Sequence, residues 1–189
     1  MEETENIEGE KVNKLSVCNE DNFETILKYQ HTLFSKTINL EVPQLLIDTS
    51  LIIDVLLGRD SIFLEEATKI IQLVFSGEIN WYITGIGLRD IWDIIRKLKG
   101  KKDANYLIIK LLNSFSVCNL NKETIKNSSN YYLNSIESAI QIEFAKNNKI
   151  DGIITLREKY FLGCGWDNIF TPAQFLDEYE SFTSFFNFS

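Results

Sequence analysis

The fold of this chain is decided by the stretch LLIDTSLIIDVLL, which runs from Leu45 to Leu57. Three aliphatic residues lead to Asp48, and after a polar step a second apolar run ends at Gly58. A short apolar run bounded by polar residues is typical of a buried central strand, and the second run suits a helix ended by a glycine. The stretch therefore predicts a strand–turn–helix unit with Asp48 at the strand's carboxyl end, where open α/β sheets usually place their ligands. The alternative is that Asp48 serves only as a helix cap.

The rest of the chain alternates between the two kinds of element. Further strands are expected at residues 80–84, 115–119, 152–155 and 168–170, and helices at 61–75, 87–98, 103–113, 122–129, 135–146 and 172–179. Strands that alternate with helical stretches indicate βαβ units and a sheet covered on both faces. The fold class predicted is therefore α/β, a three-layer α/β/α sandwich around a central, mostly parallel sheet of four to five strands.

The chain divides into one domain and its extensions. Residues 1–20 are acidic and their apolar residues show no periodic spacing, which predicts a disordered tail. Residues 21–43 are expected to contain one amphipathic helix before the core. The core domain is expected at 44–180, followed by an aromatic tail at 181–189. The amino-terminal helix could dock on the domain or present its apolar stripe to a partner. That stripe consists of Phe23, Ile26, Leu27, Leu33 and Phe34.

Composition excludes several classes of protein. At 189 residues with 44% hydrophobic content the chain can bury one sizeable core. No run approaches about 18 apolar residues, so no membrane-spanning helix is expected, and the acidic amino end differs from a signal peptide. A cytoplasmic location is the default expectation. Three widely spaced cysteines and the single His31 argue against a disulfide framework, a zinc site or imidazole chemistry. Carboxylates are the expected catalytic groups.

The net charge of −8 is unfavourable for binding a nucleic acid, although local patches matter more than the sum. The one dense basic run is Arg96–Lys102, which is either a functional patch or a basic helix end that favourably meets the helix dipole. No glycine-rich phosphate motif follows any strand, so a nucleotide-binding α/β protein is disfavoured.

Four motifs, in this order and spacing, resemble the PIN domain, a nuclease fold found in toxins of toxin–antitoxin pairs and in RNA-processing enzymes. The resemblance covers roughly Leu45 to Leu176. The motifs are LIDTSLIIDVLL at 46–57, ITGIGLRDI at 83–91, SIESAIQ at 135–141, and GIIT at 152–155 followed by Phe161 and TPAQFL at 171–176.

The resemblance implies a cluster of acids at the carboxyl edge of the sheet that holds Mg²⁺ or Mn²⁺, hard cations that take oxygen ligands and activate a water for attack on phosphate. Asp48 matches the first acid and Asp90 the second, where the family usually has Glu. The third and fourth positions hold Ser138 and Tyr160, and Glu137 neighbours the third. The resemblance therefore implies Asp48, Asp90 and Glu137 as catalytic residues and metal ligands.

Other acids stay open as candidates. Glu158 lies on a loop near the fourth position, and Asp54 and Asp93 lie on helices near the first two acids. Their structural alternatives are a solvated position or a salt bridge to Arg89 or Lys97. Asp151 is excluded, because about four strand residues at roughly 3.3 Å each place it at the opposite edge of the sheet.

Two functions are compatible with this pattern. The first is a toxin-like, metal-dependent endoribonuclease, with activity weakened or lost, that cleaves RNA and is held by an antitoxin-like protein or as a homodimer. The alternative is an inactive PIN-like binding or regulatory module that acts through protein–protein contacts. Glu137 or Glu158 pointing at the Asp48–Asp90 pair would favour the nuclease, and Tyr160 in that space would block it. A nuclease should also have a basic rim there, with candidates Arg89, Arg157 and Lys159.

Overall fold

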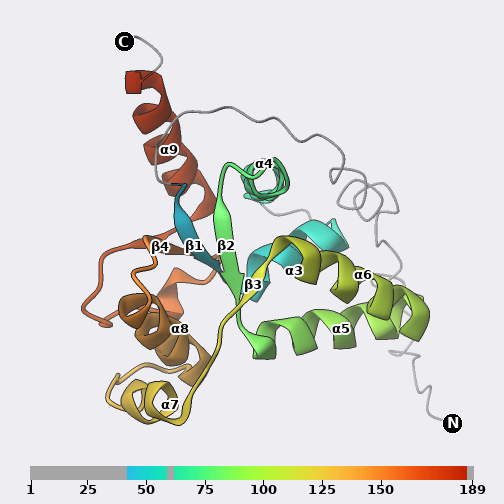
Figure 1. Cartoon of the computed structure of the whole chain (residues 1–189), viewed down its shortest axis with the longest axis horizontal. Coiled ribbons are helices and arrows are strands. Elements are labelled where there is room, and N and C mark those ends of the chain that lie inside the picture. Colours follow the sequence, from blue (N-terminus) through green and yellow to red (C-terminus); the bar gives the residue numbers. More distant parts are fainter. Residues whose placement is uncertain (1–41, 59–61, 187–189) are drawn as a thin grey trace, which may run out of the picture.

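The computed structural model describes residues 42–58 and 62–186, with residues 182–186 in backbone only. The acidic tail and the amphipathic helix expected before the core lie outside the described residues. Within them a five-stranded, all-parallel sheet has the order β3-β2-β1-β4-β5, with helices on both faces (Figure 1). This confirms the α/β/α architecture predicted from the sequence.

The strands are β1 (Gln44–Ile47), β2 (Asn80–Ile83), β3 (Ser116–Val117), β4 (Gly152–Ile154) and β5 (Ile169–Phe170). The helices are α3 (Thr49–Leu57), α4 (Leu64–Phe75), α5 (Gly85–Lys99), α6 (Lys101–Ser114), α7 (Lys122–Ser128), α8 (Ile136–Asn147) and α9 (Pro172–Phe186), with a 3₁₀ turn η2 (Glu158–Tyr160). The helix at the carboxyl end runs past its expected end at Tyr179 and through most of the aromatic tail.

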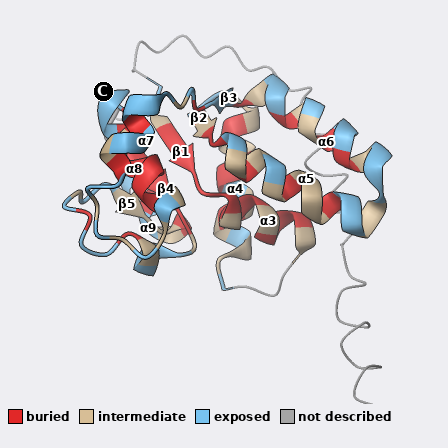
Figure 2. Cartoon of the chain, turned by 90° about the horizontal axis from the view of Figure 1, so that it is seen from below, coloured by how far each residue is buried: buried red, intermediate tan, exposed pale blue. Residues whose placement is uncertain are grey.

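The alternating side chains of the strands divide the core into two halves. On β1, Leu45 and Ile47 pack with α3, α4, α5, α6 and α9, whereas Leu46 faces α8 and the segment after β4. The same alternation separates Ile154 from Ile153 on β4. Strands β1 and β4 are therefore buried on both sides, which is why they are continuous apolar runs in the sequence. Figure 2 shows the central strands as buried and the outer helix faces as exposed.

Strand β1 lies at the centre of the sheet and fixes the position of Asp48. It pairs with β2 on one side and β4 on the other, and the backbone N–H of Asp48 donates to the carbonyl of Ile154 at 2.9 Å. The strand order reverses between β1 and β4, and the crevice outside such a reversal is the usual ligand position of an open α/β sheet. Asp48 and Thr155, the residues that follow these two strands, lie at this point.

Helices α5 and α6 form an antiparallel hairpin whose tip carries the basic run. Gly100 joins them with φ 92° and ψ 172°, a conformation open essentially only to glycine. Arg96, Lys97 and Lys99 occupy the last turn of α5, where a cation favourably meets the helix dipole. The dipole explanation does not extend to the other two cations of the run, because Lys101 and Lys102 begin α6.

Candidate active site

Asp48 lies between β1 and α3 with only 2% of its side chain exposed. It occupies the position before the first residue of α3, yet its side chain makes no capping hydrogen bond. The carboxylate therefore does not serve as a helix cap, which was the structural alternative suggested by the sequence. It points instead toward the carboxyl end of β4.

Hydroxyl groups and a guanidinium occupy both oxygens of Asp48. Oδ2 accepts hydrogen bonds from Ser50 Oγ at 2.8 Å and Thr155 Oγ1 at 2.6 Å. Arg157 donates from Nη2 to Oδ1 at 2.9 Å, and also from Nη2 and Nε to Oδ2 at 3.2 and 3.3 Å. A two-pronged arginine–carboxylate pair is a strong, directional interaction. The buried negative charge of Asp48 is thus compensated within the chain.

Arg157 is held from its outer side as well. Its guanidinium carbon lies 5.5 Å from the ring centre of Tyr160, within the range of a cation–π contact, and its backbone N–H donates to Thr155 Oγ1 at 2.9 Å. Lys159 also lies over the Tyr160 ring. The sequence suggested Arg157 as part of a basic rim, but the guanidinium turns inward onto Asp48. Tyr160, at the expected position of the fourth acid, supports this arginine.

Glu137 lies in the first turn of α8 and faces the same site. Ser135 begins that helix by accepting a hydrogen bond from the backbone of Ser138, and the Glu137 carboxylate accepts one from Thr84 Oγ1 at 3.3 Å. Burial raises the pKa of Glu137, and the charges of Asp48 and Asp90 raise it further, while Thr84 and Arg157 act in the opposite direction. The side chain is therefore close enough to both aspartates to be repelled by them.

Asp90 is engaged with a different arginine. Its Oδ1 accepts from Arg89 Nη2 at 2.7 Å and Nε at 3.0 Å, and both side chains are substantially exposed. Asp93 pairs with Arg96 at 3.5 Å rather than with Arg89 or Lys97, the two partners suggested from the sequence.

Glu158, Asp54 and Asp151 are the remaining acidic candidates. Glu158 is exposed on η2, and Asp54 is buried within α3. Asp151 accepts a hydrogen bond from the backbone N–H of Gln44 at 2.7 Å, at the amino end of β1, as its exclusion from the site required.

The described residues do not fit a divalent cation. Among them no group of three or more His, Cys, Asp or Glu side chains is placed to hold a metal ion. The most buried candidate ligand, Asp48, has both oxygens engaged by Arg157 and hydroxyl donors. Hard cations require several free oxygen ligands, and here a guanidinium stands against the oxygens that would supply them.

Three polar residues follow three neighbouring strands and organise this edge. Asp48 follows β1, Thr84 follows β2, and Thr155 follows β4. Thr84 Oγ1 accepts from the N–H of Gly87 at 3.0 Å, which begins α5, and it also donates to Glu137. Sequence reasoning assigned no role to Thr84 or Thr155. The signal that could have found them is the polar residue placed directly after each apolar strand.

Helix α5 approaches α3 very closely at Gly87. A Cβ atom built there would overlap Thr49 Oγ1 and crowd Thr84 Oγ1 and Ile83. The Thr49 hydroxyl is buried and has no hydrogen-bond partner among the residues that the structure describes. A glycine at 87 is therefore a requirement of packing that brings Asp90 toward the carboxyl edge.

A parallel sheet with acids gathered at the carboxyl edge of β1 and β2 defines a PIN-like α/β domain. A model of the PIN domain family matches residues 44–157, more than half of the chain, and the chain belongs to this family. No curated protein matches it. No helix in the described part of the chain is both long and apolar enough to cross a membrane.

Two of the solved structures that share the fold are similar to most of this domain. One is a toxin–antitoxin complex from Klebsiella pneumoniae, with a TM-score of 0.50 and 20% identity over 67% of this chain and 96% of that chain. The other is VapC20 from Mycobacterium tuberculosis, a sarcin–ricin loop cleaving toxin, with a TM-score of 0.50 and 14% identity over 66% of this chain and 97% of that chain. At these identities the likeness shows the fold and not the chemistry.

Proposed function

We propose that this PIN domain does not use metal-dependent hydrolysis and acts as a binding or regulatory module through protein–protein contacts. The observation that carries the proposal is the pair between Arg157 and Asp48, in which a side chain of the protein itself neutralises the buried carboxylate. A guanidinium carries a permanent positive charge, but it neither coordinates a water nor lowers the pKa of one as a divalent ion does.

The residues around this pair support the same proposal. Ser138 is buried without a carboxylate, and Tyr160 stacks on the arginine where the family has another acid. Asp90 is exposed to solvent and forms an ion pair with Arg89. Two of the four expected acids are thus replaced, and the two aspartates are each paired with an arginine. This arrangement favours an internally neutralised site over a hydrolytic one.

A protein partner fits the surface and the relatives. Three large apolar side chains are exposed at helical spacing along α6, namely Tyr106, Ile109 and Leu112. The solved relative from Klebsiella pneumoniae is a toxin–antitoxin complex, which supports an antitoxin-like or regulatory protein as the partner class. A homodimer and a cytoplasmic location belong to the same proposal.

The second candidate is a weak Mg²⁺- or Mn²⁺-dependent endoribonuclease acting on RNA with Asp48, Asp90 and Glu137. One observation favours it: Glu137 faces the two aspartates despite its offset along α8. The relative VapC20, a sarcin–ricin loop cleaving toxin, supports RNA as the substrate class.

Calorimetric titration of Mn²⁺ into the full chain separates the two candidates. We expect no binding up to about 5 mM, which corresponds to less than about 4 kcal/mol of affinity. Sub-millimolar binding that the Asp48→Asn variant abolishes, together with Mn²⁺-dependent cleavage of RNA, would establish the nuclease and overturn the proposal.

A restored variant provides the matched positive control. The triple substitution Arg157→Ala, Ser138→Asp and Tyr160→Asp removes the internal cation and returns two carboxylates to the family's positions. We expect this variant, and not Arg157→Ala alone, to bind Mn²⁺ with a measurable heat and to unfold at a higher temperature when Mn²⁺ is added.

A further inference from the structure

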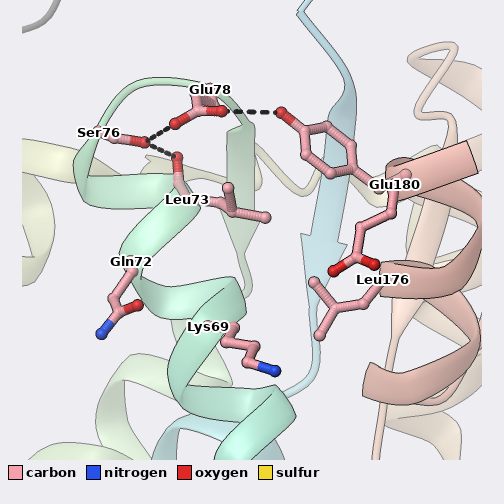
Figure 3. A pocket seen from close by; sticks show the side chains of 8 residues that line it. Lys69, Gln72, Leu73, Ser76, Glu78, Leu176 and Glu180 are labelled. Atoms are coloured by element: carbon pink, nitrogen blue, oxygen red, sulfur yellow. Dashed lines mark hydrogen bonds between the residues drawn. The ribbon is translucent and has the colours of Figure 1, made fainter. Parts of the chain in front are cut away.

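A groove between α4 and α9 lies at the amino edge of the sheet, away from the acids. Its volume is about 460 Å³, and the residues that line it include Lys69, Leu73, Glu78, Leu176, Tyr179 and Glu180 (Figure 3). The side chains of Leu73 and Leu176 face into it from the two helices, together with Lys69 and Glu180. It combines leucine side chains with charged groups, a lining that suits an amphipathic helix.

The walls of the groove are fixed by hydrogen bonds. Tyr179 donates its phenolic hydrogen to Glu78 Oε2 at 3.1 Å, which joins α9 to the turn after α4. Ser76 Oγ donates to the other carboxylate oxygen of Glu78 at 2.9 Å. The Tyr179 ring stacks on Phe175 with centroids 5.7 Å apart. The groove is therefore a preorganised feature of the domain.

The chain enters the described domain beside this groove. The carbonyl of Pro43 accepts a hydrogen bond from the N–H of Asn80 at 2.9 Å, and Gln44 is the register partner of Asn80. Asn80 lies two residues after Glu78, which lines the groove. Pro43, near the start of the described residues, is therefore held close to the segment that contributes Glu78 to the groove.

Residues 21–36 have an apolar stripe that suits the groove, and the linker that follows them is long enough to reach it. The apolar stripe of residues 21–36 ends at Phe34, eight residues before Val42. An extended linker of that length spans up to roughly 26 Å at about 3.3 Å per residue. A tether this short gives the segment a high effective concentration at the groove, so even a weak contact is populated.

We propose that residues 21–36 form an amphipathic helix that docks its stripe of Phe23, Ile26, Leu27, Leu33 and Phe34 into the α4–α9 groove of the same chain. The docked helix would cover Leu73 and Leu176. This assignment is independent of whether the acidic edge is active, because the groove lies at the opposite edge of the sheet.

Disulfide trapping in the full chain tests the proposal directly. In a Cys18→Ser background, Gln72→Cys on the groove wall is combined with Leu27→Cys on the stripe, and in the control with Thr25→Cys on the opposite face of the expected helix. Cys118 and Cys164 are buried and do not compete. Mild oxidation should give a cross-link within one chain for Leu27→Cys, and at least about fivefold less for Thr25→Cys, because helical neighbours two positions apart face different directions. A cross-link between two chains would assign the groove to a second copy and overturn the proposal, as would equal or absent cross-linking.

Hydrogen exchange gives a second measurement that needs no new cysteine. In the full-length Leu27→Asp variant we expect the amides of α4 and α9 that border the groove to exchange at least about fivefold faster than in wild type, because loss of a packed neighbour promotes local opening. The control Thr25→Asp should leave them unchanged. Equal exchange in the two variants would overturn the proposal.

Discussion

The guanidinium of Arg157 and the carboxylate of Asp48 come from positions 109 residues apart in the chain and meet at 2.9 Å. One member of the pair is buried and the other is 45% exposed, so the arginine closes the site from its solvent side. A single positive charge cannot balance every acid nearby, and Arg89 provides a second one beside Asp90. The carboxyl edge is thus compensated by two guanidinium groups that belong to the chain.

Removing the arginine should destabilise the protein. Arg157→Ala leaves the charge of Asp48 buried with only hydroxyl donors. We expect a loss of about 1–3 kcal/mol in the free energy of unfolding. This loss is smaller than that for breaking a fully buried ion pair, because the arginine is partly exposed. The matched control is Arg96→Ala. Arg96 is similarly exposed at 42%, but its partner Asp93 is 41% exposed, so the loss there should stay below about 1 kcal/mol. Urea unfolding measures both, and equal losses would contradict the role given to burial.

Gly87→Ala should destabilise the protein, although alanine normally favours a helix more than glycine does. Gly→Ala within a helix normally stabilises by up to about 1 kcal/mol, yet at position 87 the new methyl group would overlap Thr49 Oγ1, so we expect a loss of about 1–3 kcal/mol. Gly85→Ala, two residues earlier with open space around its Cβ position, should be neutral or stabilising. Adding Thr49→Ala to Gly87→Ala should restore much of the loss. Chemical denaturation of these three variants and of Thr49→Ala alone provides the test, and additive effects of Thr49→Ala and Gly87→Ala would argue against the contact.

The ionisation of Glu137 should make the protein less stable as pH rises. Its pKa is raised in the folded protein by burial and by Asp48 and Asp90, so the folded state holds this proton more tightly than the unfolded chain. The resulting stability is present below the ordinary carboxylate range and is lost as pH rises through the raised pKa. Glu137→Gln should therefore increase the melting temperature at pH 7.5 by about 1–2 °C and have little effect at pH 4. Glu178→Gln, an exposed change of the same charge, serves as the control, and a pH-independent effect of Glu137→Gln would contradict the assignment.

The thiol of Cys118 should be inert in the folded state. Burial raises the pKa of Cys118 to about 12, and the thiolate is the reactive form, so at pH 8 only about one thiol in ten thousand is ionised. In a Cys18→Ser, Cys164→Ser background we expect negligible reaction with a thiol reagent over minutes and rapid reaction once guanidinium chloride unfolds the chain. Fast labelling without denaturant would show that the segment around β3 opens readily.

The elements of the fold could be predicted because their patterns are local. The apolar run at 45–47, the αL glycine after Leu57 and the alternation of later segments each specify their element without reference to distant residues. The predicted ends of the helices and strands differ from the observed ends by a few residues, since caps and last turns depend on the surrounding structure. The long α9 is the largest difference, because an aromatic-rich segment carries no strong signal for continuing a helix.

The site could be predicted only in part. Asp48, Asp90 and Glu137 were expected from motif positions, and the structure brings them to one edge of the sheet. The inward turn of Arg157 could not be predicted, because the direction of a side chain after a strand depends on which groups the fold presents to it. Nor does sequence spacing reveal that the hydroxyls of Thr155 and Ser50, rather than a helix amide, would donate to Oδ2 of Asp48.

From the central place of β1 we expect an order of events during folding. Its pairing with β2 needs a chain closure of moderate length, whereas its pairing with β4 joins Leu45 to Gly152 across most of the domain. Long closures carry a greater entropic cost and tend to form late. We therefore expect Asp48 to lack Thr155 and Arg157 until β4 has paired with β1, and during synthesis its carboxylate has no arginine partner before residue 157 is made. The buried ion pair should therefore form late, once β4 lies beside β1.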